Sequence, residues 1–511
     1  MVATPTLLRS TPGIKRDGTV FEGEFYVDGQ WCRFQRGLPR KMGGYRSLTT
    51  YMSGPVRTMT TFSANGTTFL HAGSEEKLER VLFDQQSNAG AVYDRTPAGL
   101  ATDTQRLWQF DTGFDTVTNA SSIIAHGGSN LLNIDSTVTS KPYVGDVTGT
   151  GALTSLSGAP AVSGGVCVVH PYLFVYGSNG YVAWSVAGNF NDFTNTGSGD
   201  GYVTAQKIVK GLPFRGGPGN SPAALFWSMD SLVRCTFTGG STVFQFDTII
   251  DQTSILSSSC VIEYDGVFYW CAVDRFMMFN GVAREVPNQL NLNWFFDNLN
   301  YQQRQKVFAV KVPRYGEIWW CYPRGSATEC THAVIYNVRE NTWYDTVLPE
   351  IGRSAGTYNA INYHPFMTGL DLDPLSGKYI VWQHEYGVDK IQGQYITPIR
   401  SYFETADISL NALPQNATSR ALRCTMIEPD FVQSGPMNVY ITGRANARSN
   451  EVATEVKTFP ETPSTPEEQV VFFKDIRREM RFVFESNSLG GDYQMGQVIA
   501  HLEPADARYL S

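Results

Sequence analysis

The chain lacks the features that identify membrane proteins, secreted proteins and most nucleic-acid binders. It contains no run of about 18 apolar residues, the length that a membrane-spanning helix needs. Its first residues, MVATPTLLRS, lack the apolar core of a secretory signal peptide. The formal net charge of −8 argues against a general nucleic-acid binder, which is usually basic. We therefore expect no membrane insertion, and folding in a cytosol-like compartment.

Cysteine and histidine are present but are not arranged for disulfide or metal chemistry. The 8 cysteines include no Cys-x-x-Cys pair, and the 7 histidines include no His-x-x-x-His pair. Because the spacing is irregular and a signal peptide is missing, the thiols are expected to be reduced and mostly buried. No metal and no other cofactor is predicted.

Motifs of the common enzyme classes are missing as well. No Gly-x-x-x-x-Gly-Lys-Ser/Thr loop is present to bind a nucleoside triphosphate. Residues 371–377 (DLDPLSG) lack the third ligand and final Glu of a calcium loop, which favours a tight turn. Residues 198–202 (SGDGY) lack the Trp of a sialidase Asp box. The acids that a glycosidase would need stand in no recognisable motif: Glu263, Asp265, Glu317, Asp371 and Asp373. The chain is predicted not to be an enzyme.

Short aromatic and β-branched runs that end in turn residues are abundant. Residues 261–270 (VIEYDGVFYW) lead directly into residues 271–281 (CAVDRFMMFNG), and residues 317–322 and 333–344 follow the same pattern. Asp-Gly and Asn-Gly between such runs predict β-hairpins. The Trp and Tyr rings are expected to fill the space between packed sheets.

These units recur every ~40–50 residues, the spacing of one four-stranded propeller blade. They predict an all-β fold with a β-propeller of six or seven divergent blades over residues 51–398. Neither a regular Trp-Asp dipeptide nor a kelch double-glycine series is present. A large β-sandwich or jelly-roll array is the alternative. One short helix is expected within residues 289–305.

Two further regions flank the predicted propeller. Residues 399–511 alternate apolar and polar positions, which is typical of half-buried antiparallel strands and predicts a small β-sandwich. Residues 1–50 form an N-terminal arm that is expected to join this sandwich. Charged residues make up 17% of the chain, below the usual quarter, which indicates a surface that partners cover.

Three segments resemble one known family. They are residues 31–45 (WCRFQRGLPRKMGGY), the strands around residues 265–270 and 317–323, and residues 481–498 (RFVFESNSLGGDYQMGQV). Together they resemble the tail-nozzle proteins of short-tailed double-stranded DNA bacteriophages, also called packaged-DNA stabilisation or tail hub proteins. The resemblance implies a virion protein, assembled in the host cytoplasm, that forms a ring, typically a hexamer. Such a ring lies below the portal and adaptor, extends the DNA channel, retains packaged DNA and supports fibres or tailspikes.

The strongest local charge signal lies in the arm, with no acid among its cations: Arg33, Arg36, Arg40, Lys41 and Arg46. A solvated surface strand is one interpretation. A docking strip for a neighbouring subunit or the adaptor is the second, since Arg pairs well with carboxylates. DNA contact is the weakest, because bound phosphates would slow genome release. We expect double-stranded DNA to pass an acidic wall without specific binding.

Residues 211–222 (GLPFRGGPGNSP) show no strand pattern and are long enough to move. Within them, Phe214, Arg215, Gly216 and Gly217 are candidates for a gate on the channel axis or a fibre-docking loop. An ordinary loop between blades is the simpler interpretation.

A carbohydrate- or protein-binding propeller, such as a lectin-like adhesin, is the alternative function. It should repeat an aromatic site once per blade. The blades of this chain do not repeat one aromatic position in step, which favours the ring.

Overall fold

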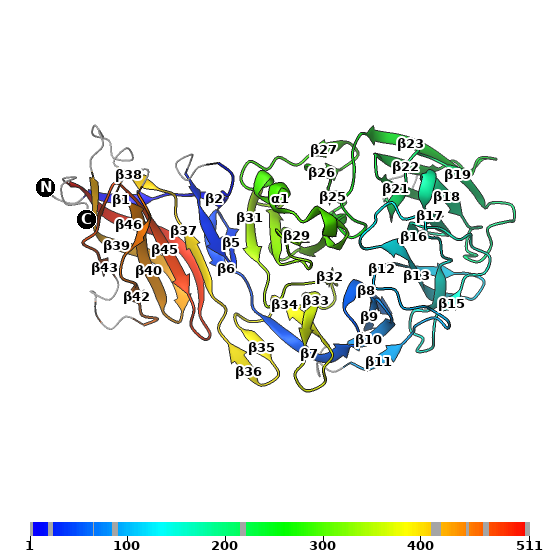
Figure 1. The fold of residues 1–511 in the computed structure, drawn as a ribbon, viewed down its shortest axis with the longest axis horizontal. Coiled ribbons are helices and arrows are strands. Elements are labelled where there is room, and N and C mark those ends of the chain that lie inside the picture. Colours follow the sequence, from blue (N-terminus) through cyan, green and yellow to red (C-terminus); the bar gives the residue numbers. More distant parts are fainter. Residues whose placement is uncertain are drawn as a thin grey trace.

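The protein is described by a computed structural model that covers residues 4–18, 24–64, 66–83, 90–214, 221–409, 421–445, 449–462, 465 and 470–505. Within these ranges it is almost entirely β-structure, arranged as a propeller beside a sandwich (Figure 1). The helices within the described ranges are α1 (Leu292–Asn298), η1 (Ser178–Gly180) and η3 (Tyr301–Lys306). The short helix expected within residues 289–305 is thereby confirmed. Among the described helices none is long and apolar enough to cross a membrane.

Seven sheets of the described chain form the blades of the propeller, and each blade consists of four antiparallel strands. The first blade consists of β8 (Val56–Ala64), β9 (Thr67–Ser74), β10 (Leu78–Phe83) and β11 (Val92–Asp94). The second consists of β12 (Arg106–Asp115), β13 (Ala120–Asn130), β14 (Tyr143–Asp146) and β15 (Thr154–Ser155). The third consists of β16 (Gly165–Val169), β17 (Tyr172–Tyr176), β18 (Tyr181–Trp184) and β19 (Gly199–Tyr202). The fourth blade consists of β20 (Ile208–Pro213), β21 (Ala223–Ser228), β22 (Ser231–Phe237) and β23 (Phe244–Asp251). The fifth consists of β24 (Ile262–Tyr264), β25 (Val267–Cys271), β26 (Phe276–Phe279) and β27 (Ala283–Glu285). The sixth consists of β28 (Phe308–Val312), β29 (Glu317–Tyr322), β30 (His332–Asn337) and β31 (Thr342–Val347).

The seventh blade joins the two ends of the propeller. Its inner strands are β32 (Ala355–Tyr358), β33 (Pro365–Leu372) and β34 (Tyr379–His384), and its fourth strand is β7 (Tyr45–Met52), from before the first blade. β7 pairs antiparallel with β34. β8, the innermost strand of the first blade, contacts both β12 of the second blade and β32 of the seventh, so the circle of blades is closed. The hairpin of β35 (Lys390–Gln392) and β36 (Tyr395–Thr397) extends this sheet. The predicted boundary at residue 50 therefore falls inside a propeller strand.

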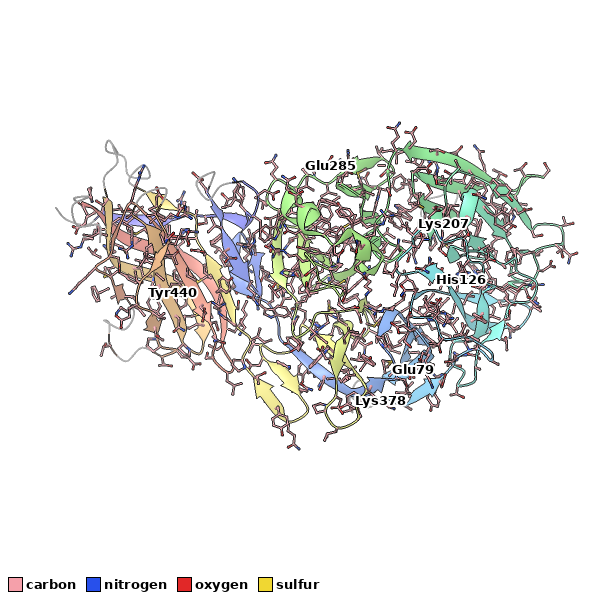
Figure 2. The ribbon with its side chains drawn as sticks, in the orientation of Figure 1. Glu79, His126, Lys207, Glu285, Lys378 and Tyr440 are labelled. Carbon is pink, nitrogen blue, oxygen red and sulfur yellow. The ribbon has the colours of Figure 1, made fainter. Side chains whose placement is uncertain are left out.

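Hairpin turns and aromatic packing build the blades as the sequence predicts. Asp265 and Gly266, between β24 and β25, have φ angles of 49° and 81°. Two successive positive φ values fit a type I′ turn, which Asp-Gly favours. Trp227 of the fourth blade packs edge-on against Trp270 of the fifth, with ring centroids 5.8 Å apart. Side chains fill the spaces between the blades (Figure 2).

The sandwich combines strands from both ends of the chain. One sheet contains β1 (Thr4–Leu8), β5 (Cys32–Gln35), β6 (Leu38–Lys41), β39 (Ala421–Ser434), β43 (Val471–Phe472), β44 (Ile476–Arg477) and β46 (Asp492–Ala505). The other contains β4 (Asp28–Gln30), β37 (Ser401–Glu404), β38 (Ile408–Ser409), β40 (Met437–Arg444), β41 (Val452–Ala453), β42 (Lys457–Phe459) and β45 (Glu479–Ser486). Buried and half-buried residues alternate along β40, as expected for a sheet with one face in the core. The expectation that the N-terminal arm joins the C-terminal sandwich is confirmed.

One hydrophobic core is continuous from the sandwich into the sixth and seventh blades. Phe34 of β5 lies 5.5 Å from Tyr344 of β31, and Trp31 lies 6.2 Å from Trp319 of β29, measured between ring centroids. The small parallel sheet of β2 (Thr11–Ile14) and β3 (Phe25–Tyr26) adds to the contact through β31. We call this contact region the junction; it joins the sandwich to one edge of the propeller (Figure 1).

Candidate functional site

The arm hairpin, formed by β5 and β6, carries four of the five cations predicted to dock a partner. Its turn consists of Arg36 and Gly37, whose φ angles are 56° and 75°. This geometry suits a two-residue hairpin. On the other side, β6 pairs with β46, with Arg40 opposite Gln494. The hairpin thus lies at the edge of the sandwich sheet, beside the junction.

Arg33 lies inside the junction, where it joins two acids of the propeller. Its Nε is 2.9 Å from Glu317 Oε1 and its Nη2 is 2.5 Å from Glu385 Oε1. Burial disfavours the charged form of Arg33, but the two carboxylates outweigh burial and raise its pKa. Glu317 also accepts hydrogen bonds from Trp319 Nε1 at 2.8 Å and from the Tyr344 hydroxyl at 2.7 Å. A buried ion pair of this kind is tolerated because the carboxylate is fully hydrogen-bonded.

Lys41, on the neighbouring strand, is also buried. Its Nζ donates a hydrogen bond of 2.6 Å to the carbonyl of Gly491, in the loop before β46. Arg33 and Lys41 therefore bind groups of their own chain and are not available to a partner. This corrects the docking strip inferred from the sequence. Arg33 pairs with Arg40 and Lys41 with Cys32, so the two buried cations lie on opposite faces of the hairpin. Both faces are covered at these positions, which a run of charges in the sequence does not reveal.

The remaining three cations of the strip reach the surface to different degrees. Arg40 is partly exposed and donates to Gln35 Oε1 at 2.7 Å, within the hairpin. Arg46 is partly exposed and donates to Gln383 Oε1 at 2.7 Å, across the β7–β34 pair. Arg36, at the hairpin turn, is exposed. Of the five predicted docking residues, Arg36 is the one best placed to meet a partner.

A second buried cation, Arg353, stabilises the strand that closes the propeller. Its guanidinium lies 3.3 Å from both Glu350 and Asp371, and its Nε donates to His384 Nε2 at 3.1 Å. The hydroxyl of Tyr45, the first residue of β7, donates to Glu350 at 2.9 Å. Asp371 and Glu317, considered above as possible catalytic acids, are thus both engaged in ion pairs within the fold.

The predicted gate loop follows β20. Phe214 is partly buried, and its ring packs 5.6 Å from that of Phe279 in the fifth blade. Arg215, Gly216 and Gly217 lie outside the described residues. The simpler interpretation placed this loop between two blades. It joins β20 to β21, which are neighbouring strands of the same blade.

A cavity of about 570 Å³ lies on the propeller axis. The innermost strand of every blade contributes to its wall: β8, β12, β16, β20, β24, β28 and β32. At one end Pro213, Glu263 and Gly266 are exposed, so the cavity reaches the surface there. At the other end Arg57 is buried and lies 2.6 Å from Glu329. The cavity is therefore an axial pocket that opens to the surface at the end near Pro213, Glu263 and Gly266.

Two residues of opposite charge, Lys210 and Asp111, line the pocket wall and attract each other electrostatically. Lys210 of β20 lines the wall and has no hydrogen-bonded or ion-paired partner among the described residues. Asp111 of β12 accepts the backbone N–H groups of Thr112 at 2.8 Å and Val168 at 2.7 Å. Burial lowers the pKa of Lys210 and raises that of Asp111. Sequence reasoning missed both, because they lie on different blades and belong to no motif.

No group of three or more His, Cys, Asp or Glu side chains is placed to hold a metal ion within the described ranges. All 8 cysteines are buried and none forms a disulfide, which confirms the expectation that the thiols are buried. Comparison with protein-family models gives no match, and comparison with curated proteins gives none either.

Proposed function

We propose that the protein is a structural component of a bacteriophage tail. In this proposal it forms a ring, typically a hexamer, below the portal and adaptor. The ring extends the DNA channel, retains packaged DNA and supports fibres or tailspikes. Double-stranded DNA passes through without specific binding, because a chain of net charge −8 repels the phosphate backbone.

The observation that carries the proposal is the position, in the folded protein, of the segments that resemble tail-nozzle proteins. Residues 31–45 and 481–498 come from opposite ends of the chain, yet β6 and β46 pair directly through Arg40 and Gln494. Lys41 adds the bond to Gly491. These two segments therefore lie side by side in one sheet of the sandwich, and Arg33 of the first segment pairs with Glu317 of the remaining segment across the junction. Such an arrangement suits a protein whose work is assembly.

The shape of the subunit also supports the proposal. A continuous core and the buried Arg33–Glu317 pair join two β-domains into one elongated body (Figure 1). Interfaces between independent domains are usually smaller and more polar. A rigid, elongated subunit can contact neighbours along a ring through one domain and axial partners through the other.

Electron microscopy of virions made from the genome that encodes the chain tests the proposal. Antibody label against the protein should lie on the tail below the portal, and averaged tails should show a ring of identical subunits. The isolated protein should sediment as a monomer or weak oligomer and form the ring when portal–adaptor particles are added. Label on another part of the virion, or none, would contradict the proposal.

Arg36 provides a residue-level test of docking. Arg36→Ala should weaken binding of the subunit to portal–adaptor particles, because truncating a charge buried in an interface costs about 2–5 kcal/mol. Arg275→Ala removes a cation from the fifth blade, away from the arm, and is the matched control. Neither change should move the melting temperature. Equal binding by both variants would exclude Arg36 from the interface.

A further inference from the structure

Four arginines gather on one surface where the arm hairpin meets the sixth blade. Arg36 and Arg40 belong to the hairpin, whereas Arg314 and Arg339 lie in the turns that precede β29 and β31. Arg314 and Arg40 both lie over the ring of Tyr315, at 5.3 Å and 5.7 Å from its centroid. Arg339 donates to the carbonyl of Arg314 at 3.0 Å. We call these four residues the arginine surface; Arg40 is partly exposed and the other three are exposed.

The arginine surface is a local excess of positive charge. Among the described residues, no carboxylate forms an ion pair with any of the four. Glu340 lies beside the hairpin turn, where its two oxygens accept the backbone N–H groups of Arg36 and Gly37 at 3.1 Å and 3.2 Å. With Glu340 counted, positive charge still prevails, although acids outnumber basic residues 48 to 40 in the chain. Exposed arginines elsewhere do find acids, as Arg275 does beside Asp274.

Two exposed residues in this region have left-handed backbone, which is costly for large side chains. The φ angle is 56° at both Arg36 and Tyr363, and Tyr363 is 76% exposed in the loop between β32 and β33. Burial lowers the pKa of His364, the next residue, with a smaller contribution from Arg314, so this loop lies near the arginine surface. Asn or Gly would occupy such positions with less strain. Because both side chains are exposed, packing does not explain the choice of Arg and Tyr, and strain of this kind collects at functional sites.

The composition of this region suits a protein partner better than a nucleic acid. Tyr and Arg are enriched among the residues that dominate protein–protein binding energy. A guanidinium can pair with a carboxylate through two parallel hydrogen bonds. The net charge of −8 already includes these four cations, so the rest of the chain is more acidic still. A DNA duplex that extends past the arginine surface would meet this acidic remainder and be repelled, whereas a compact protein face would not.

We propose that the arginine surface docks a protein face rich in Asp and Glu. Arg36, Arg314 and Arg339 pair with its carboxylates, and Tyr363 packs at the edge of the contact. The arm hairpin and the sixth blade both contribute, so the partner would hold the two domains together as well. This docking surface does not depend on the proposed role in a phage tail, because its chemistry is the same whichever assembly contains the chain.

Fluorescence anisotropy of the full-length protein with a labelled oligo-glutamate peptide tests the surface. A DNA duplex long enough to extend past the surface is the phosphate probe. At low salt the peptide should bind with a Kd below about 1 mM and about tenfold more tightly than the duplex. Replacing both Arg314→Gln and Arg339→Gln should weaken peptide binding by about fivefold or more, because two carboxylate pairs are lost.

The matched control combines Arg234→Gln with Arg275→Gln, which removes the same charge from the fourth and fifth blades. Both arginines are already paired, with Asp247 and Asp274, so peptide binding should change by less than about twofold. Circular dichroism and melting temperature show whether each variant is folded.

Arg36→Asn separates binding from folding, because Asn suits the left-handed position in this turn. The change should raise the melting temperature by about 1 °C while weakening peptide binding by about twofold. A residue with a purely structural role would not show these opposite effects. The proposal is overturned if the peptide does not bind the parent below about 10 mM. It is equally overturned if the folded Arg314→Gln, Arg339→Gln variant binds the peptide as the parent does, or if the duplex binds the parent more tightly than the peptide.

Discussion

Arg33 Nε lies 2.9 Å from Glu317 Oε1, and both side chains are buried at the junction between the sandwich and the sixth blade. The N–H of this nitrogen does not point at the carboxylate, so the contact is an ion pair; the hydrogen bond comes from Nη2, at 3.2 Å from Glu317 Oε2. Arg33 and Glu317 are 284 residues apart in the sequence, so this contact ties the N-terminal arm to the propeller.

Replacing Arg33 should destabilise the protein strongly. Arg33→Met leaves Glu317 and Glu385 buried without their cation, and removing one member of a buried pair costs about 3–5 kcal/mol. Denaturant titration followed by tryptophan fluorescence measures the change. Arg36→Met, on the same hairpin but exposed, should change stability by less than about 0.5 kcal/mol. Adding Glu317→Gln to Arg33→Met should recover part of the loss, and a purely additive double mutant would argue against a direct pair.

Closure of the propeller by β7 predicts that a core change in this strand weakens both neighbouring blades. Leu48 is 3% exposed and packs with Val381 and Val56. Leu48→Ala should cost about 2–5 kcal/mol through the cavity it leaves. Hydrogen exchange should accelerate in β34 and β8 together. Ile396→Ala, on the exposed β36 of the same sheet, is the control and should leave exchange in both strands unchanged.

Buried histidines predict a loss of stability at mildly acidic pH. His126 is fully buried, and burial lowers its pKa to about 4, against the two carbonyls that accept from its Nε2 and with a smaller contribution from Lys207 (Figure 2). Its Nδ1 accepts the N–H of Gly128, so a proton there would break that bond. Between the unfolded pKa of about 6.5 and this value, the unfolded state binds a proton that the folded state does not. Stability therefore falls as pH falls through this window, by up to roughly 3 kcal/mol.

His126→Gln, which does not titrate, should flatten the dependence of unfolding free energy on pH between 6.5 and 4. The measurement is urea denaturation at half-unit pH steps for the parent and the variant. Parallel curves would show that His126 is not the group that titrates. Both curves include the contribution of His332, whose pKa is also lowered to about 4 by burial. This contribution cancels in the difference between the two curves, which is therefore the informative quantity.

The thiols should be unreactive in the folded protein. All 8 are buried, and burial raises the pKa of Cys32 to about 12, which disfavours the thiolate that reacts. A thiol-specific chromogenic disulfide should therefore titrate almost no cysteine under native conditions and all 8 after denaturation, without prior reduction. Rapid native labelling, or a shortfall after denaturation, would contradict the structure.

Local patterns predicted the blades because hairpins depend on neighbouring residues. Asp265-Gly266 predicts a hairpin turn, and both residues have the positive φ angles that such a turn requires. Alternation along residues 437–444 likewise predicts the half-buried strand β40. The same local logic failed for the cations of the arm. A run of Arg and Lys signals charge, whereas the burial of each side chain depends on what covers the two faces of β5 and β6.

Composition, turn residues and periodicity by themselves determined an all-β chain with a propeller and a sandwich, because these signals act over a few residues. Only the tertiary structure decided that β7 closes the propeller, that Arg33 meets Glu317, and that Lys210 and Asp111 face one pocket. Each of these depends on contacts between residues far apart in the chain. Such contacts form when the summed burial of many side chains outweighs the entropy of bringing the segments together, and no single stretch of sequence records that balance.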